Sequence, residues 1–145
     1  MSRNRAAILL GAALFVAGCA VQGRPFERAS APQNNAVIYV YRPYHYGSLL
    51  LRPAVTCGED SARIGPGGYH AFIVPARLDQ IACSVEGAES ADQVEIDPHT
   101  RVYYIREEFV WGRLTGHPHI NPVDTDEAQT EIQKCCVQEP AAQQP

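Results

Sequence analysis

Residues 36–43 read AVIYVYRP, and this stretch decides the fold class. Its β-branched and aromatic side chains suit a pleated strand. Pro43 ends the run, because proline has no backbone N–H to donate to a neighbouring strand. Apolar or aromatic side chains fall on both faces of the expected strand, so we expect it inside a sheet rather than at an edge.

Further short runs of β-forming residues follow, separated by turn residues. The expected strands cover residues 49–57, 62–64, 69–75, 80–87, 93–97 and 101–111. Pro53 interrupts the first of them, which indicates an edge position or a bulge. The last exceeds the usual strand length of about five or six residues. Alternation would also place Glu107 on the same side as its apolar residues Tyr103, Ile105, Phe109 and Trp111, so we expect a bulge or break near Arg106 to Glu108.

The region after residue 111 is expected to hold a loop and then a helix. The loop is marked by Gly116, Pro118 and Pro122. Asp124 can cap the helix, with Glu127 reaching back to it from three positions later. Ala128 and Ile132 then share an apolar face, and the helix runs through Lys134. Six or seven strands and one terminal helix predict a mainly β protein, an antiparallel β-sandwich with one short C-terminal α-helix.

The N-terminus has the order of charges and apolar residues found in a secretory signal. Arg3 and Arg5 precede an uncharged stretch over residues 6–17, which is too short to span a bilayer comfortably, since a helix needs ~20 apolar residues. The stretch ends in Val16-Ala17-Gly18-Cys19, which resembles the bacterial lipobox. The resemblance implies that Cys19 is lipidated and that the peptide is cut before it. An uncleaved signal anchor is the alternative.

The residue after the cysteine bears on location. Ala20 stands where an Asp would favour retention at the inner membrane under enterobacterial sorting. We therefore expect the protein in the bacterial cell envelope, lipid-anchored to the outer membrane and facing the periplasm. The membrane, reached through the lipid anchor, is then one partner, and an envelope protein is a second.

These features divide the chain into four expected parts. Residues 1–18 form the signal peptide, and 19–35 hold the lipidated cysteine and a flexible tether rich in turn residues. Residues 36–136 form a single β-sandwich domain. Residues 137–145, rich in Gln, Ala and Pro, form a disordered tail.

Several short motifs resemble a family of small bacterial lipoproteins that carry a domain of unknown function. They are Tyr-Val-Tyr-Arg-Pro at 39–43, Gly-Tyr at 68–69, Tyr-Tyr-Ile-Arg at 103–106 and the acidic start of the last helix. The resemblance implies a transthyretin-like or immunoglobulin-like sandwich. A Pro-Gly pair often follows the fourth strand in this family, whereas here Pro75 precedes Ala76. The family has no known reaction, so the resemblance implies no activity.

Composition and charge exclude several classes of protein. The chain is 46% hydrophobic and 19% charged, which is ordinary for a globular protein and excludes general disorder or a polytopic membrane protein. Twelve basic side chains face 16 acidic ones, and loss of the leader removes Arg3 and Arg5. A nucleic-acid partner is therefore not expected, because phosphate backbones attract basic patches.

Four cysteines remain once Cys19 is lipidated, and a periplasmic location permits disulfides. Cys57 and Cys83 fall in separate expected strands, and closing that loop would stabilise the fold by roughly 3 to 4 kcal/mol. This is the favoured pair. The alternatives are two buried thiols, a bond from Cys135 or Cys136 to a strand cysteine, or a vicinal Cys135 to Cys136 bond, which would distort a helix terminus.

Histidines and the late cysteines give a weaker alternative. His117 and His119 flank Pro118, and together with Cys135 and Cys136 they could form a metal-binding or redox module. The spacing matches no compact metal motif, so no metal and no cofactor is expected.

No catalytic pattern is found either. Glu107 and Glu108 are adjacent, so on a strand they point to opposite faces and cannot share a proton. The serines lack the strand, elbow and helix context of a hydrolase nucleophile. We therefore expect a protein that is not an enzyme.

The most unusual feature is a group of aromatic and basic residues at the end of the first strand. The partner-binding candidates are Arg42, Tyr44, His45 and Tyr46. Tyr and Arg are enriched at binding hot spots, although Tyr44 and Tyr46 could instead pack over the rim of the sandwich. The expected function is a non-enzymatic structural or protein-binding accessory, with a periplasmic inhibitor of a lytic enzyme or toxin as the variant.

Overall fold

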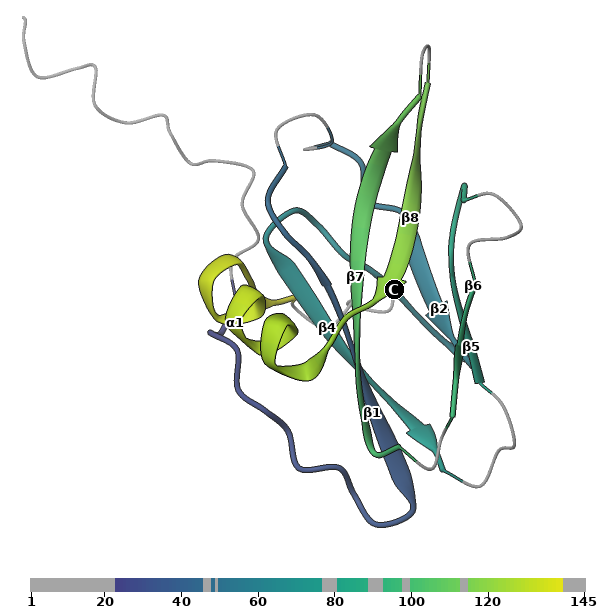
Figure 1. The fold of residues 1–145 in the computed structure, drawn as a ribbon, viewed down its shortest axis with the longest axis vertical. Coiled ribbons are helices and arrows are strands. Elements are labelled where there is room, and N and C mark those ends of the chain that lie inside the picture. Colours follow the sequence, from purple (N-terminus) through teal and green to yellow (C-terminus); the bar gives the residue numbers. More distant parts are fainter. Residues whose placement is uncertain are drawn as a thin grey trace, which may run out of the picture.

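The structure is a computed structural model, and it describes residues 23–45, 48, 50–76, 81–88, 93–97, 100–112 and 115–139. Two β-sheets pack face to face, and one C-terminal helix covers the outer face of the larger sheet (Figure 1). This confirms the mainly β two-sheet architecture with a terminal helix.

The larger sheet has five strands in the order β8-β7-β1-β4-β9. Their bounds are β1 Asn35–Arg42, β4 Gly68–Pro75, β7 Val102–Trp111, β8 Gly116–Pro122 and β9 Val137–Gln138. The smaller sheet has four strands in the order β3-β2-β5-β6. Their bounds are β2 Ala54–Cys57, β3 Asp60–Arg63, β5 Ile81–Val85 and β6 Gln93–Ile96. The helix, α1, covers Thr125–Cys135.

Strand β1 lies at the centre of the larger sheet, as its sequence predicts. Every residue from Ala36 to Arg42 is buried, because β4 and β7 flank the strand and apolar layers cover both of its faces. The sheet is not wholly antiparallel, however. β1 runs antiparallel to β4 but parallel to β7, and β4 runs parallel to β9.

The alternation along β1 creates two cores. Ile38 and Val40 point between the sheets, where they join residues of the smaller sheet. Tyr39 and its neighbours on the same face point outward and pack under Ala128 and Ile132 of α1. Two apolar layers, one on each face, explain why this strand has no polar side.

Helix α1 begins as predicted. Asp124 is its N-cap, and the backbone N–H of Asp126 donates to the Asp124 carboxylate at 2.9 Å. Glu127 takes a different role from the predicted one, because its carboxylate lies 3.4 Å from Arg106 Nη1 on β7. Among the described residues, no helix is both long enough and apolar enough to cross a membrane.

The predicted break in β7 and the predicted loop after it are both wrong. β7 is continuous over ten residues because β8 pairs with it from Ile105 to Trp111. Proline is tolerated in β8 because this strand is an edge. The Val123 N–H donates to the Tyr104 carbonyl, so the backbone N–H groups of odd-numbered residues in this strand point toward β7. Pro118 and Pro122 hold even-numbered positions, where an N–H would point away from the sheet and is not needed for pairing.

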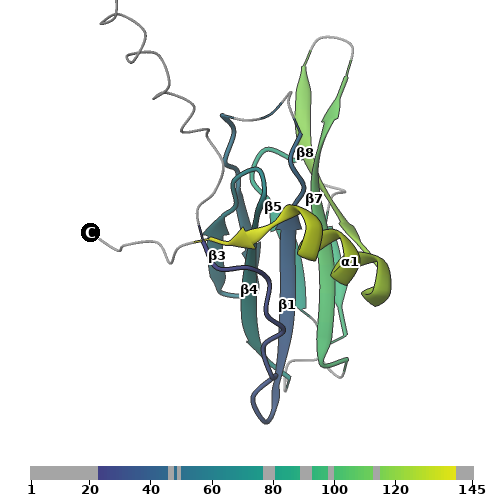
Figure 2. The ribbon, with the colours of Figure 1, turned by 90° about the vertical axis from the view of Figure 1, so that its left-hand side faces the viewer.

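Contacts extend beyond the predicted limits of the domain. Residues 23–34 run along the same outer face as α1 (Figure 2). Phe26 packs edge-on against Tyr39 and Tyr69, with ring centroids 5.3 Å apart in each case. Pro25 bridges to Val137, which the sequence assigned to the tail but which belongs to β9. The described part of the expected tether is thus packed on the sheet.

Candidate functional site

A notch opens in the larger sheet where β1 leaves it. The last residue pair between β1 and β7 is Tyr41 with Arg106, whereas β7 continues to Trp111 beside β8. Figures 1 and 2 show the β7–β8 hairpin projecting beyond the rest of the sandwich. A cavity of about 270 Å³ lies at the notch. Its lining includes Arg42, Pro43, Arg106, Glu107, Glu108, Phe109 and Glu131. We call it the Glu107 cavity.

Arg42 lies beneath this cavity and is only 2% exposed. Its Nη1 donates to the carbonyl oxygens of Leu51 at 2.6 Å and Ile64 at 3.2 Å, and its Nη2 donates to that of Ser48 at 2.9 Å. Arg42 therefore fixes the chain segment around residues 48–51. Its guanidinium is buried, so the structure gives Arg42 a role inside the fold, and its part in partner binding stays a prediction.

Glu107 faces Arg42 from β7 and is 1% exposed. Its Oε1 lies 3.6 Å from Arg42 Nη1, which is an ion pair without a hydrogen bond. Neither carboxylate oxygen has a hydrogen-bond partner among the described residues. Burial raises the pKa of Glu107 to about 7, although the Arg42 charge works against that rise. A buried carboxyl with its acceptor capacity unused is the most unusual group in the described structure.

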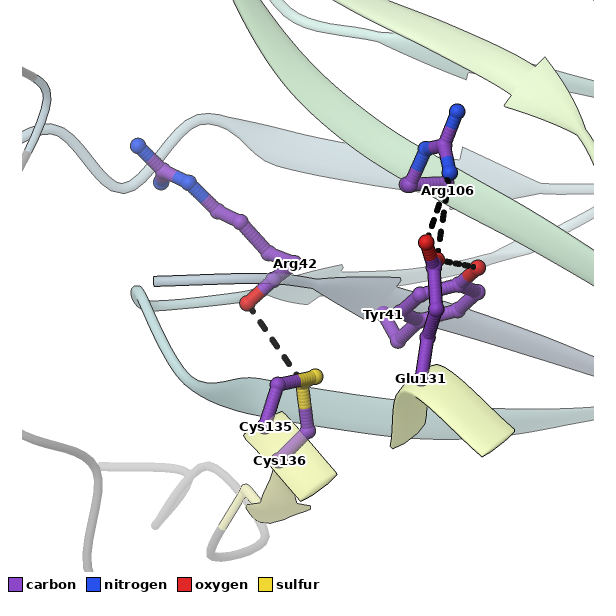
Figure 3. Close-up of a disulfide and its surroundings, with 6 residues drawn as sticks. All are labelled: Tyr41, Arg42, Arg106, Glu131, Cys135 and Cys136. Carbon is purple, nitrogen blue, oxygen red and sulfur yellow. Dashed lines mark hydrogen bonds and ion pairs between the residues drawn. A yellow bond between two sulfur atoms is a disulfide. The ribbon is translucent and has the colours of Figure 1, made fainter. Parts of the chain in front are cut away.

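A second network lies on the helix side of β7. Arg106 pairs with Glu108 and lies 3.0 Å from Glu131 Oε1, while the Tyr41 hydroxyl donates to Glu131 Oε2 at 2.6 Å (Figure 3). Burial raises the pKa of Tyr41, and the Glu131 carboxylate raises it further. Burial opposes ionisation of Glu131, but the hydrogen bonds from Tyr41 and Arg106 outweigh it and lower the pKa of this carboxyl. Glu107 and Glu108 therefore lie on opposite faces, as predicted.

The other partner-binding candidates lie near the same notch. Tyr44 is 43% exposed, and the exposed His45 accepts a backbone hydrogen bond from Ser48. Tyr46 lies outside the described residues, as does the lipidation candidate Cys19. The sequence signal for Glu107 was a charge on the core-facing side of β7, which suggested a bulge instead of a buried carboxyl.

A second hollow separates the hairpin from the segment that Arg42 holds. Its volume is about 450 Å³, and its walls include Leu50, Leu51, Pro53, Phe109 and Pro118. Large apolar side chains are exposed beside it. Leu50 is 86% exposed and Leu51 43%, and Trp111, 55% exposed, packs against the wall residue Phe109. We call Leu50, Leu51 and Trp111 the hairpin surface.

The favoured disulfide is present. Cys57 and Cys83 are bonded and are also directly paired in the register of β2 and β5. Their Cα atoms are 4.2 Å apart. This bond ties two strands of the smaller sheet together within the inter-sheet core.

Cys135 and Cys136 are bonded to each other, which is one of the alternatives that the sequence left open. The helix is not distorted, because Cys135 is its last residue and Cys136 is already extended, with φ −133° and ψ 143°. Cys136 Sγ lies 3.6 Å from the Arg42 carbonyl oxygen (Figure 3). The vicinal disulfide thus sits at the end of β1.

The histidines of the metal alternative lie in β8 rather than in a loop. His119 Nε2 is 2.6 Å from Asn121 Oδ1. Within the described ranges, no group of three or more His, Cys, Asp or Glu side chains could hold a metal ion. The structure does not gather His117, His119, Cys135 and Cys136 into one site, since the two cysteines are bonded to each other.

Comparisons with family models, with curated proteins and with solved structures find no match for this chain. Its function is therefore inferred from its own residues.

Proposed function

We propose that this protein is a bacterial outer-membrane lipoprotein, anchored through Cys19 and facing the periplasm, and that its sandwich is a non-enzymatic binding accessory for another envelope protein. The observation that carries the binding part is the hairpin surface, where three large apolar side chains stay exposed beside one hollow. The lipobox resemblance supports the anchor.

Apolar side chains gathered on a projecting element favour a protein interface. Leu50, at 86% exposed, forgoes most of the roughly 1.5 to 3 kcal/mol that full burial by a partner could provide, and the half-buried Leu51 and Trp111 forgo a smaller part. Buried aromatic anchors also dominate binding energy at interfaces. The Trp111 ring packs against Phe109 at a tilt of 57° and a centroid distance of 5.1 Å, which limits its freedom before binding. Arg42 contributes indirectly, because its bond to the Leu51 carbonyl positions one side of the hollow.

Photo-crosslinking in cells tests this proposal. A photoreactive residue in place of Trp111 should give a discrete adduct, whereas the same residue in place of Ile73 should not. Ile73 is a matched control because it is also exposed, at 49%, but pairs with Val37 near the opposite end of β1. Equal adducts at both positions, or none at Trp111, would refute binding at the hairpin surface.

The anchor has its own test. Membrane fractionation with lipid labelling should show Cys19-dependent incorporation that Cys19→Ala abolishes. Incorporation that persists in the variant would contradict the lipoprotein part while leaving the binding part to be judged by crosslinking.

The projecting hairpin favours one variant of the binding function, an inhibitor of a lytic enzyme or toxin. A narrow hairpin can enter a partner's cleft, whereas a flat sheet face cannot. If so, purified protein should slow peptidoglycan hydrolysis by its target, and Trp111→Ala should relieve the inhibition. Inhibition unchanged by the substitution would exclude the hairpin as the inhibitory element.

A redox module is the second candidate, and the Cys135 to Cys136 bond favours it. Alkylation followed by mass spectrometry should find this bond opening and closing as the ratio of reduced to oxidised glutathione is varied, while Cys57 to Cys83 stays closed. A bond that never opens in the folded protein would eliminate this candidate.

A further inference from the structure

We propose that the hollow beside the hairpin surface receives an apolar side chain of the partner protein, and that an acidic residue next to that side chain pairs with Arg52. This inference rests on the proposed binding function and deepens it by naming the chemistry of the segment that binds. It does not depend on the lipid anchor.

The first support is that solvent reaches both the apolar and the charged groups of this hollow. Its walls include Leu50, Leu51, Arg52 and Phe109. Leu50 is 86% exposed and Leu51 43%, Arg52 is exposed as well, and Phe109 is half-buried. A partner can therefore contact the apolar wall and the Arg52 guanidinium at the same time.

The second support is that hydrogen bonds fix the backbone on both sides of the hollow. The Leu51 carbonyl accepts from Arg42 Nη1 at 2.6 Å, and the Leu51 N–H donates to the Ser48 carbonyl at 3.2 Å. On the other side, Phe109 and Pro118 are paired residues of β7 and β8. The hollow is therefore formed before a partner arrives, as most ligand sites are, and its volume of about 450 Å³ accommodates a leucine or phenylalanine side chain.

The third support is a positive charge left over at the rim. The hollow has three charged wall residues, Arg52, Arg63 and Glu86. Glu86 is already engaged, because its Oε2 lies 3.2 Å from Arg63 Nη1 and accepts a hydrogen bond from the Ala54 N–H. Arg52 forms no ion pair with any residue in the described part of the chain. One positive charge therefore remains in this wall, although the whole chain has a net charge of −4.

The sign of that charge selects the partner. A carboxylate at the rim gains an ion pair with Arg52, whereas an ammonium group meets a like charge. The charge of Arg52 is also felt inside the fold. Burial lowers the pKa of Arg42, Glu107 opposes this change, and the charge of Arg52 adds to it. An anion beside Arg52 therefore also relieves repulsion on the buried Arg42.

The test uses the full mature chain and tetrapeptide probes, with Trp111 as the reporter. Trp111 is the only tryptophan in the sequence, and its ring packs against the wall residue Phe109. Titration with the peptide N-acetyl-Glu-Leu-Phe-Glu-amide should give a saturable change in tryptophan emission. Replacing both Glu of the peptide by Gln should weaken binding about threefold to fivefold, which is within the range of an exposed ion pair. Replacing its Leu-Phe by Ser-Ser should abolish the saturable change.

Variants assign the preference for the acidic peptide to Arg52. In Arg52→Gln the Glu and Gln peptides should bind equally, because the charge that distinguishes them is gone, whereas Arg52→Lys should keep the preference. Arg28→Gln is the matched control and should also keep it, since Arg28 is exposed but belongs to the segment that runs along the outer face of the larger sheet (Figure 2). Both arginines are exposed, so all three variants should fold.

Three results would overturn the inference. They are no saturable change with the acidic peptide, equal binding of the Glu and Gln peptides by wild type, and a preference that persists in Arg52→Gln. Photo-crosslinking in cells judges the proposed function separately. An adduct at position 111 that is unchanged by Arg52→Glu would support the interface and refute the role of Arg52. The predicted peptide preference without any adduct in cells would refute the interface with an envelope protein and leave the binding chemistry of the hollow intact.

Discussion

Replacing Glu107 by glutamine should change how stability depends on pH. Glutamine has nearly the same shape but cannot ionise. The pKa of Glu107 rises from 4.5 to about 7 on folding, so the folded protein holds this proton more tightly than the unfolded chain does. The resulting stability is fully present below pH 4.5, is lost as pH rises to about 7, and is constant above that.

The size of the effect follows from that rise in pKa. At 1.36 kcal/mol for each pKa unit, ionising Glu107 costs the folded state about 3 kcal/mol relative to pH 4. No discount for solvent is needed, since the side chain is 1% exposed. The free energy of unfolding of Glu107→Gln, minus that of wild type, should therefore increase by about 3 kcal/mol between pH 4.5 and 8.

Urea denaturation at several pH values measures this difference. Glu131, whose lowered pKa gives the opposite trend below about pH 4.5, is present in both proteins and cancels. Glu95→Gln should track wild type throughout. A difference that stays constant with pH, or that decreases as pH rises, would refute the assignment of Glu107 as a buried, unsatisfied carboxyl.

Three further substitutions probe the groups that hold the fold and the notch. Arg42→Met should lower the free energy of unfolding at pH 8 by about 3 to 5 kcal/mol, and by less at pH 5 where Glu107 is protonated; an equal loss at both pH values in urea melts would contradict their pairing. Replacing both Cys57 and Cys83 by serine should cost roughly 3 to 4 kcal/mol in the same assay, and a loss near zero would show that the bond does not brace the sheet. Asp124→Ala should cost about 1 kcal/mol and lower helicity by circular dichroism, whereas Asp124→Asn should retain most of the cap.

The elements that the sequence predicts well are those with a strong local pattern. The β-branched run of β1 places it inside a sheet, and Asp124 with the spacing of Ala128 and Ile132 defines α1. These features depend on nearest neighbours along the chain. Their outcome is the same whatever the rest of the fold does.

The errors come from contacts between distant segments. β8 was predicted as a loop because Gly116, Pro118 and Pro122 disfavour a strand, but its pairing with β7 and its edge position make them tolerable. Phe26 anchors a segment that looks like a tether, because its aromatic partners lie more than ten residues away.

The location of the candidate site could be predicted from the sequence, but the roles of its residues could not. The sequence pointed to the end of β1 as a binding region, and the notch lies there. It did not reveal the structural role of Arg42, whose guanidinium donates to carbonyls that only the folded chain brings near. Glu107 drew notice as an exception to the alternation in β7, but a single exception does not tell a bulge from a buried charge.

The most direct test of the central claim is to titrate Glu107 itself. The ¹³C shift of its carboxyl carbon, assigned by comparison with Glu107→Gln, can be followed from pH 4 to 9. We predict a midpoint at about 7. A midpoint near 4.5 would show that the carboxylate is already satisfied, and would contradict the account.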